Sequence, residues 1–255
     1  MVKNKKVLEN SFGQIYNYNG ESWIVYALPN KRKGEIMVTY EKIKSNEDVK
    51  KYIIAADDSL KALGYTEHSF AHVAKCAERA AYVLESVGRD AHTVELAKIA
   101  AHLHDIGNLV NRIEHSQSGA VMAFRILDNM GMPAEDIATV VTAIGNHDEG
   151  TGVPVNDVSA ALILADKSDV RRTRVRNSDI STFDIHDRVN YSVEWSSLDI
   201  NAETKEVVLR LKIDPTISSI INYFEIFLER MLLCQKAADK LGLKFKLVIN
   251  DQQII

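Results

Sequence analysis

The amino-acid sequence predicts a mainly α-helical protein with small β elements toward both ends of the chain. Apolar residues recur with a helical period through the middle of the chain, whereas short β-type runs lie near its two ends. The composition, with 46% apolar and 26% charged residues, is typical of a globular protein. A chain of 255 residues is long enough for one large or two small domains with a hydrophobic core.

The first part of the chain, residues 1–50, is expected to form a small β appendage. Short strand-like runs there are separated by Asn19-Gly20 and by turn-forming residues at 29–34. The predicted strands cover residues 14–18, 23–28 and 35–39.

The middle of the chain, residues 51–178, is expected to be a helical core. Its apolar period predicts helices at residues 67–87, 93–106, 116–130, 134–145 and 158–174. Residues suited to helix ends lie near these boundaries, namely Thr66, Gly88, Asp90, Gly131, Pro133 and Asp157. Two separate signals, period and capping, therefore favour an all-α centre.

The last part, residues 179–255, is expected to be an α+β extension. A polar stretch is followed by two runs typical of a hairpin, at 191–195 and 206–213. A helix at 217–241 and a strand at 244–249 complete it. The sequence leaves open whether the β elements of the two ends join into one sheet.

Charge and cysteine content limit the classes of partner. A net charge of −4 gives no overall basic field for nucleic acid or anionic membranes, so an anion site would have to be local. The chain has 2 cysteines, a polar start and no apolar run of about 20 residues. We therefore expect a cytoplasmic protein that binds neither membranes nor nucleic acid.

Several histidines and aspartates of the helical core are candidate metal ligands. His72 lies among the apolar positions of its helix, and His104-Asp105 ends an almost wholly apolar run. Asp166 follows six apolar residues at 160–165. A buried carboxylate beside an imidazole is costly unless a cation compensates it, and a divalent metal does so most effectively. Imidazole and carboxylate ligands suit Fe, Mn, Zn, Ni or Co better than Mg or Ca.

Alternatives without a metal remain for single residues. An inward His72 alone is more often a core histidine bonded to a carbonyl group. His-Asp pairs also recur at 147–148 and 186–187, so the pair alone is weak evidence.

The ordered set of a histidine, a His-Asp pair, further histidines and a final aspartate resembles the pattern of HD-domain metal-dependent phosphohydrolases. The set in this chain is His72, His104, Asp105, His115, His147 and Asp166. The form His-Asp-Ile-Gly at 104–107 is also common in that family, and the resemblance covers about residues 65–176. It implies an HD-domain helical bundle, a hydrolase and a small phosphorylated substrate, such as a nucleotide.

The further histidines are similar to those of two-metal members, including cyclic-dinucleotide phosphodiesterases and symmetrical diadenosine tetraphosphate hydrolases. Asn108 and Asn146 stand where the phosphodiesterases carry Lys and His. The His-x-x-x-Gly-Ala form at 115–120 is closer to the tetraphosphate hydrolases, but the interval between Asp105 and His115 is short for them. The resemblance therefore does not select a substrate.

The resemblance also implies roles for the ligands. One metal would be bound by His72, His104, Asp105 and Asp166, and a second by His115 and His147, with Asp105 as the bridge. Fe or Mn is expected first, with Zn, Ni or Co as alternatives. A water made acidic by the metals would supply a hydroxide nucleophile, so no Ser or Cys nucleophile is needed.

Phosphate also requires cationic side chains. Lys167 and Arg171 are one helical turn apart if the helix continues past Asp166, and Arg112 follows the His-Asp pair. We expect all three to bind phosphate and Lys167, with Asp105, to take part in catalysis. For each cation alone, a solvated helix end is an equal alternative.

Three functions remain open. The first is an enzyme of this kind, and the second is a non-catalytic metal-binding sensor, whose flanking elements would form a partner or homodimer surface. A one-metal hydrolase is a third alternative, in which His115 and His147 would be dispensable.

Overall fold

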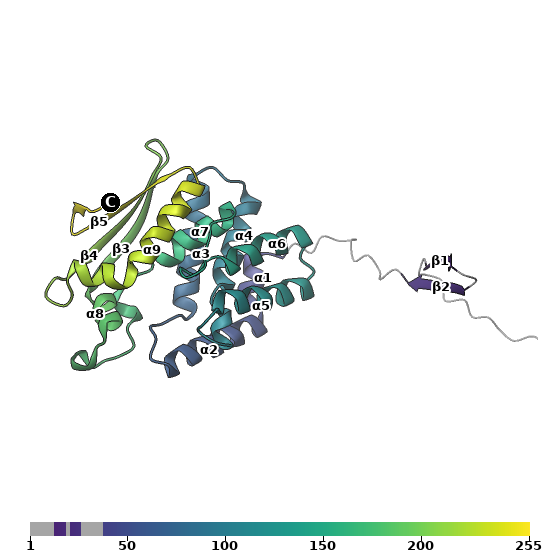
Figure 1. Ribbon diagram of the computed structural model, residues 1–255, viewed down its shortest axis with the longest axis horizontal. Helices are drawn as coiled ribbons and strands as arrows, with labels where there is room; N and C mark the ends of the chain where they lie inside the picture. The colour runs from purple at the N-terminus through teal and green to yellow at the C-terminus, as the bar shows by residue number, and fades with distance from the viewer. Residues whose placement is uncertain (1–12, 19–20, 27–37) are drawn as a thin grey trace, which may run out of the picture. The chain divides into compact units, whose positions relative to one another are not determined.

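Figure 1 shows a computed structural model of the chain, in which residues 13–18, 21–26 and 38–255 are described. The chain divides into two compact units, Met1–Met37 and Val38–Ile255. In the first unit β1 (Gly13–Tyr18) pairs antiparallel with β2 (Glu21–Tyr26), as the sequence predicts. The third predicted strand, 35–39, lies outside the described residues except for its last two, which are not in a strand.

The second unit is a bundle of helices followed by a small sheet, which confirms the mainly α fold. Its helices up to residue 167 are α1 (Tyr40–Ser45), α2 (Glu47–Ala62), α3 (Phe70–Ser86), α4 (Ala91–Leu103), α5 (His115–Asn129), α6 (Ala134–Gly145) and α7 (Asp157–Lys167), with the short 3₁₀ helix η1 (Ile106–Leu109) between α4 and α5. Helix α7 is apolar on all sides because α3, α4, α6 and the later helix α9 pack around it. It is the centre of the bundle.

Several predicted boundaries hold and others shift for local reasons. Asp90 caps α4 as predicted, its carboxylate accepting a hydrogen bond from the Thr93 amide. Ser69 instead of Thr66 caps α3, and Asn156 instead of Asp157 caps α7. Helical structure also begins at Tyr40, inside the segment expected to be a β appendage.

Helix α7 ends at Lys167 and does not continue to residue 174. The next residues turn inward, so that Ser168 and Asp169 are fully buried. The chain then passes through the short 3₁₀ helices η2 (Arg172–Arg174) and η3 (Ile180–Thr182). The prediction that Lys167 and Arg171 share a helical face is therefore wrong.

The C-terminal extension is an α+β unit, as predicted. Helix α8 (Ile185–Ser192), which the sequence did not predict, leads into β3 (Val193–Asn201) and β4 (Glu206–Ile213). Helix α9 (Ile220–Lys240) then crosses over to β5 (Lys244–Ile249), parallel to β4, and β6 (Gln252–Gln253) closes the order β3-β4-β5-β6. Among the described strands, β1–β2 and β3–β6 form separate sheets.

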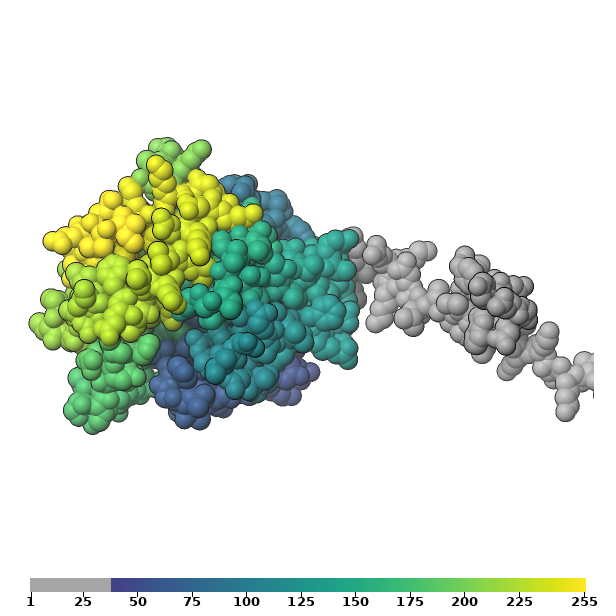
Figure 2. Space-filling model, viewed as in Figure 1, coloured from purple at the N-terminus to yellow at the C-terminus, as the bar shows by residue number. Residues whose placement is uncertain are grey.

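Helix α9 joins this sheet to the bundle. Its buried face, with Tyr223, Phe227 and Met231 at four-residue spacing, contacts α7, and the helix also packs on β5. Figure 2 shows the yellow-green C-terminal segment lying directly against the teal helices. None of the helices that the structure describes is long and apolar enough to cross a bilayer.

Candidate metal centre

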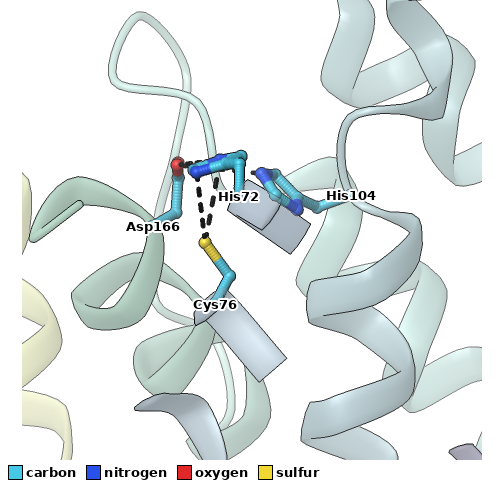
Figure 3. A group of neighbouring side chains, drawn as sticks. All are labelled: His72, Cys76, His104 and Asp166. Carbon is cyan, nitrogen blue, oxygen red and sulfur yellow. Dashed lines mark hydrogen bonds and ion pairs between the residues drawn. The ribbon is translucent and has the colours of Figure 1, made fainter. Parts of the chain in front are cut away.

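The six predicted ligands, far apart in sequence, come together where several helices end. His72 lies in the first turn of α3, and His104 and Asp105 follow α4. His115 begins α5, His147 follows α6, and Asp166 is in the last turn of α7. The four histidines and Asp105 are buried, and the Asp166 side chain is 12% exposed. Figure 3 shows His72 and Asp166 beside each other, with His104 next to them.

Each of the four imidazoles has its Nδ1 atom held by an oxygen. The Nδ1 of His104 lies 2.8 Å from the Ala101 carbonyl, and that of His147 lies 2.6 Å from the Ile144 carbonyl. His115 is held in the same way by the carbonyl of Arg112 at 3.1 Å. When Nδ1–H donates to such an oxygen, Nε2 can offer its lone pair to another partner, which is how proteins orient histidines toward a metal.

His72 is oriented by a carboxylate that the sequence reading missed. Its Nδ1 lies 2.9 Å from Oδ2 of Asp169, which is fully buried. Asp169 is in turn surrounded by cations, with Arg171 Nε at 3.1 Å and Lys75 Nζ at 3.4 Å from its Oδ1. The position of this aspartate, three residues after Asp166, was a usable signal because one helical turn brings such residues close.

The Nε2 atoms meet the two ligand carboxylates. Oδ2 of Asp105 lies 3.2 Å from Nε2 of His104 and 3.6 Å from Nε2 of His72, while its Oδ1 lies 3.6 Å from Nε2 of His115. Oδ1 of Asp166 lies 3.3 Å from the Nε2 atom of His72. The Nε2 atoms of His115 and His147 are 3.2 Å apart. Asp105 thus faces two groups of histidines, one with each oxygen.

Two atoms at the middle of this arrangement are buried without a hydrogen bond. Nε2 of His104 and Oδ2 of Asp105 make no hydrogen bond of good geometry among the described residues, and they face each other as an ion pair at 3.2 Å. Burying such a pair is costly unless further ligands or charges compensate it. Imidazole nitrogen and carboxylate oxygen are the donors that divalent transition metals prefer. The residues present therefore fit a metal.

The electrostatics of the cluster agree with a cation site. Burial alone would raise the pKa of Asp105, but His104 and its neighbours lower that pKa well below the usual range. Burial would likewise lower the pKa of His104, yet Asp105 and Asp166 raise it to about 10. For His147 burial prevails and lowers the pKa well below its usual value. The site thus holds ionised carboxylates, and a metal can replace the proton that His104 keeps.

Cys76, which is not among the six predicted ligands, also lies at this centre. Its sulfur is 3.7 Å from both ring nitrogens of His72, as Figure 3 shows. Burial raises the pKa of the thiol well above its usual value. Cys76 therefore packs against the imidazole as a neutral thiol.

His68 and His102, which are not among the six predicted ligands, have different surroundings. The ring of His68 stacks edge-on against His72 at 5.5 Å, and its Nδ1 is held by the Thr66 carbonyl. His102 packs edge-on against Tyr40 instead, 5.5 Å from its ring. His68 borders the metal centre, whereas His102 belongs to the core.

Lys167, one of the predicted phosphate-binding residues, is buried beside Asp166. Its Nζ atom lies 2.8 Å from Oδ2 of Asp166 and 2.6 Å from Oε2 of Glu149. The other oxygen of Glu149 lies 2.8 Å from Nε of Arg230 on α9. Neither Glu149 nor Arg230 was predicted, because nothing in the local sequence links two positions so far apart.

The other two predicted phosphate ligands have different surroundings. Arg171 is held by carboxylates, with its guanidinium 3.1 Å from both Asp169 and Glu67, and it does not line the cavity described next. Arg112 lies beside His115 instead, with its Nη1 atom 3.1 Å from Nε2 of His115. Of the two, only Arg112 lies next to open space.

That space is a cavity of about 520 Å³ beside His115. The loop before α5, the first turn of α5 and the loop after α6 form its walls. The lining residues are Arg112, Ile113, Glu114, His115, Ser116, Gln117, Asp148 and Thr151. Its volume is within the range of small-molecule sites.

A comparison with protein-family models agrees with this geometry. A family model described as the HD domain matches residues 69–187, a segment that holds all six predicted ligands. Among solved structures, a predicted HD superfamily hydrolase from an uncultured Thermotogales bacterium is 25% identical, with a TM-score of 0.39 over 51% of this chain and 73% of that chain. No curated protein matches the chain.

Proposed function

Because residues 69–187 of the chain are an HD domain, we propose that the protein is a metal-dependent phosphohydrolase. The observation that carries the proposal is that four buried histidines and two carboxylates lie together: Oδ2 of Asp105 is 3.2 Å from Nε2 of His104, and its Oδ1 is 3.6 Å from Nε2 of His115. Such a cluster is costly without a cation. Its residues are those that the family pattern assigns to metal.

The proposed centre binds two metals. His72, His104 and Asp166 lie on the Oδ2 side of Asp105, and His115 with His147 lies on the side of its Oδ1. Asp105 is then the bridging carboxylate. Bound divalent metals would acidify a water molecule and neutralise phosphoryl oxygens, which is the chemistry that phosphoester hydrolysis requires.

The proposed substrate is a small phosphorylated molecule, such as a nucleotide. The cavity beside His115 is large enough for one. Arg112 is part of its wall, and the Arg112 guanidinium lies next to the proposed ligand His115. Arginine binds phosphate oxygens through two parallel N–H groups. Arg112 also lies 5.7 Å over the exposed ring of Tyr65, which can extend the site toward a planar group.

Lys167 is the proposed catalytic lysine. Its Nζ atom lies within 2.8 Å of two carboxylate oxygens, and an ammonium group has three N–H donors, so it can still offer one to a phosphoryl oxygen. Burial alone would lower the pKa of Lys167, but Asp166 and Glu149 raise it above its usual value. The amine therefore stays charged, as a phosphate contact requires.

The experiment that tests the function begins with metal content, measured by elemental mass spectrometry on untagged protein purified without oxygen. The wild type is then loaded with Mn²⁺ or Fe²⁺ and assayed on bis(p-nitrophenyl) phosphate and a set of nucleotides. We expect about two metals per chain, and activity in Asp105→Ala below about one-hundredth of wild type, because a lost ligand exceeds the 10- to 100-fold effect of an outer residue.

His92→Ala is the matched control, since His92 is exposed and pairs only with Asp136 in the described structure. Full activity in Asp105→Ala would contradict the proposal. Metal binding without hydrolysis would favour a non-catalytic sensor. Activity that survives His115→Ala and His147→Ala would favour a single metal.

A further inference from the structure

A chain of charged side chains leads from the C-terminal extension to the metal centre. Arg230 on α9 lies 2.8 Å from Oε1 of Glu149, and Oε2 of Glu149 lies 2.6 Å from Nζ of Lys167. Lys167 lies 2.8 Å from Oδ2 of Asp166, whose Oδ1 faces His72. Each link is a charge-assisted contact at hydrogen-bond distance. The signs alternate along the four residues, so each charge has a partner.

The Arg230 end of this row of charged side chains lies outside the polypeptide segment that matches the HD domain. The match ends at residue 187, whereas α9 begins at Ile220. Arg230 is fixed there by its own surroundings, since its guanidinium stacks over the ring of the buried Phe227 at 4.3 Å. The two strands that flank α9, β4 and β5, are paired in one sheet, which holds both ends of the helix. Arg230 is thus a fixed point against which Glu149 can be positioned.

Glu149 needs such a fixed point because it lies in the loop after α6. A loop carboxylate without a second partner can turn toward water, whereas one held at both oxygens has one orientation. Its side chain is 19% exposed, compared with 22% for Arg230 and 5% for Lys167. The contacts are therefore shielded enough from solvent to be stronger than surface ion pairs.

The other end of this row of charged side chains is Lys167, which contacts the proposed metal ligand Asp166. A ligand carboxylate must present the correct oxygen, and groups that bind its other oxygen hold it in place. Lys167 binds Oδ2 of Asp166, which leaves Oδ1 directed to the histidines. The same lysine can do this only if Glu149 keeps its amine on that side.

From these contacts we propose that Arg230 is a positioning residue of the metal centre. Acting through Glu149 and Lys167, it orients the Asp166 carboxylate for metal binding. The C-terminal extension is then part of the site, although Arg230 reaches Asp166 only through Glu149 and Lys167. The inference rests on metal binding by the HD residues and does not depend on the substrate proposed above.

The test is the affinity of the full-length protein for Mn²⁺, measured by calorimetric titration. Arg230→Met keeps the length of the side chain and removes the charge, and we expect its Kd to rise about tenfold, as for other outer residues of metal sites. Arg230→Lys keeps the charge and should stay within about threefold of wild type. Lys236→Met, which removes an exposed charge from the same helix, is the control and should leave the Kd unchanged.

A double-mutant cycle separates positioning from a general loss of packing. Glu149→Gln alone should weaken Mn²⁺ binding about tenfold, and the combination with Arg230→Met should be no weaker than either single variant, because both break one chain of contacts. Independent structural effects would multiply to about a hundredfold. Circular dichroism of each variant checks that it is folded.

Three results would overturn the inference: an Arg230→Met Kd within about twofold of wild type, multiplying effects in the cycle, or no Mn²⁺ binding by the wild type. If Arg230→Met does not fold, Glu149→Gln and Arg230→Lys decide the question in the same way. A protein that hydrolyses no phosphoester but shows this coupling would contradict the proposed function and leave the inference standing.

Discussion

At the scale of single residues, the environment of Asp169 explains most about the candidate site. It is fully buried, holds Nδ1 of His72 and compensates Arg171, Lys75 and the nearby Arg174. Asp169→Asn keeps the shape and removes the charge. We expect metal affinity to fall about tenfold because His72 becomes a weaker base, as measured by Mn²⁺ titration.

The same substitution should also lower the free energy of unfolding by about 3 kcal/mol, because buried cations lose their partner. Urea unfolding measures this effect, and Asp179→Asn, an exposed carboxylate, is the control. Unchanged metal affinity in a folded Asp169→Asn protein would show that His72 needs no carboxylate.

A single buried histidine, His102, is expected to make the stability of the protein depend on pH. Burial lowers the pKa of His102 to about 4, while an unfolded histidine has a pKa of about 6.5. Between these values the unfolded chain binds a proton that the folded protein does not, so stability decreases as the pH falls through this window. The contribution amounts to about 2 kcal/mol between pH 7 and pH 5.

His102→Phe keeps a ring against Tyr40 and cannot take up a proton, so its stability should decrease less on acidification. The measurement is the difference between wild type and variant in the free energy of unfolding by urea at pH 7 and pH 5. Parallel pH profiles for the two proteins would refute the assignment.

At the scale of elements, Gly107 shows why a glycine follows the His-Asp pair. A Cβ atom there would lie 1.9 Å from the His115 carbonyl oxygen and 2.5 Å from the Gly119 amide nitrogen. Helix η1 and the start of α5 therefore touch through their backbones. Gly107→Ala must separate them and move His115 away from Asp105.

We expect Gly107→Ala to destabilise the protein by about 3 kcal/mol, in line with overpacking of a core, and to reduce metal content. Thermal unfolding and elemental analysis measure the two effects. Gly145→Ala is the control, since its nearest contact would be an ordinary 3.7 Å to Ala120. Equal melting temperatures for wild type and Gly107→Ala would mean that η1 and α5 can part without cost.

The helices that the sequence predicted best are those with a regular apolar stripe. Helix α6 was predicted to the residue and α3 within a few residues, because period and caps agree there. Helix α7 was predicted too long, since Asp169 turns inward and a tertiary contact overrides local propensity. Helix α8 has few apolar positions and was missed. The local sequence pattern thus predicts helices and strands, but it does not predict the tertiary contacts at which they end.

The same limit applies to the candidate site. The sequence could single out His72, His104-Asp105 and Asp166 because they stand out in apolar helices, and the family resemblance added His115 and His147 to the predicted ligands. Asp169 carried a weak signal through its spacing from Asp166. Arg230 and Glu149 carried none, because each is an ordinary charged residue until the fold brings α9 to the loop after α6.

At the scale of the whole molecule, α9 and the sheet are expected to be required for the fold of the HD segment. Tyr223, Phe227 and Met231 cover α7, which is apolar on all sides. A fragment of residues 38–178 would expose that surface, so we expect it to aggregate or to melt without a cooperative transition. The full chain is the control in both calorimetry and light scattering. A soluble 38–178 fragment with a cooperative transition would show that this segment folds independently of the C-terminal extension.

The predicted ligands of the centre are spread from His72 to Asp166, on elements that are synthesised one after another. If they bind metal, sites with two or three ligands would form during synthesis before the last carboxylate arrives. Such incomplete and adaptable sites bind divalent ions in the general order of affinity, with Cu²⁺ and Zn²⁺ ahead of Mn²⁺ and Fe²⁺, whereas a finished centre selects also by geometry. The ion found in a preparation is therefore expected to depend on which metal was abundant while the chain folded, and refolding in Mn²⁺ or in Zn²⁺ should yield two forms of the same protein.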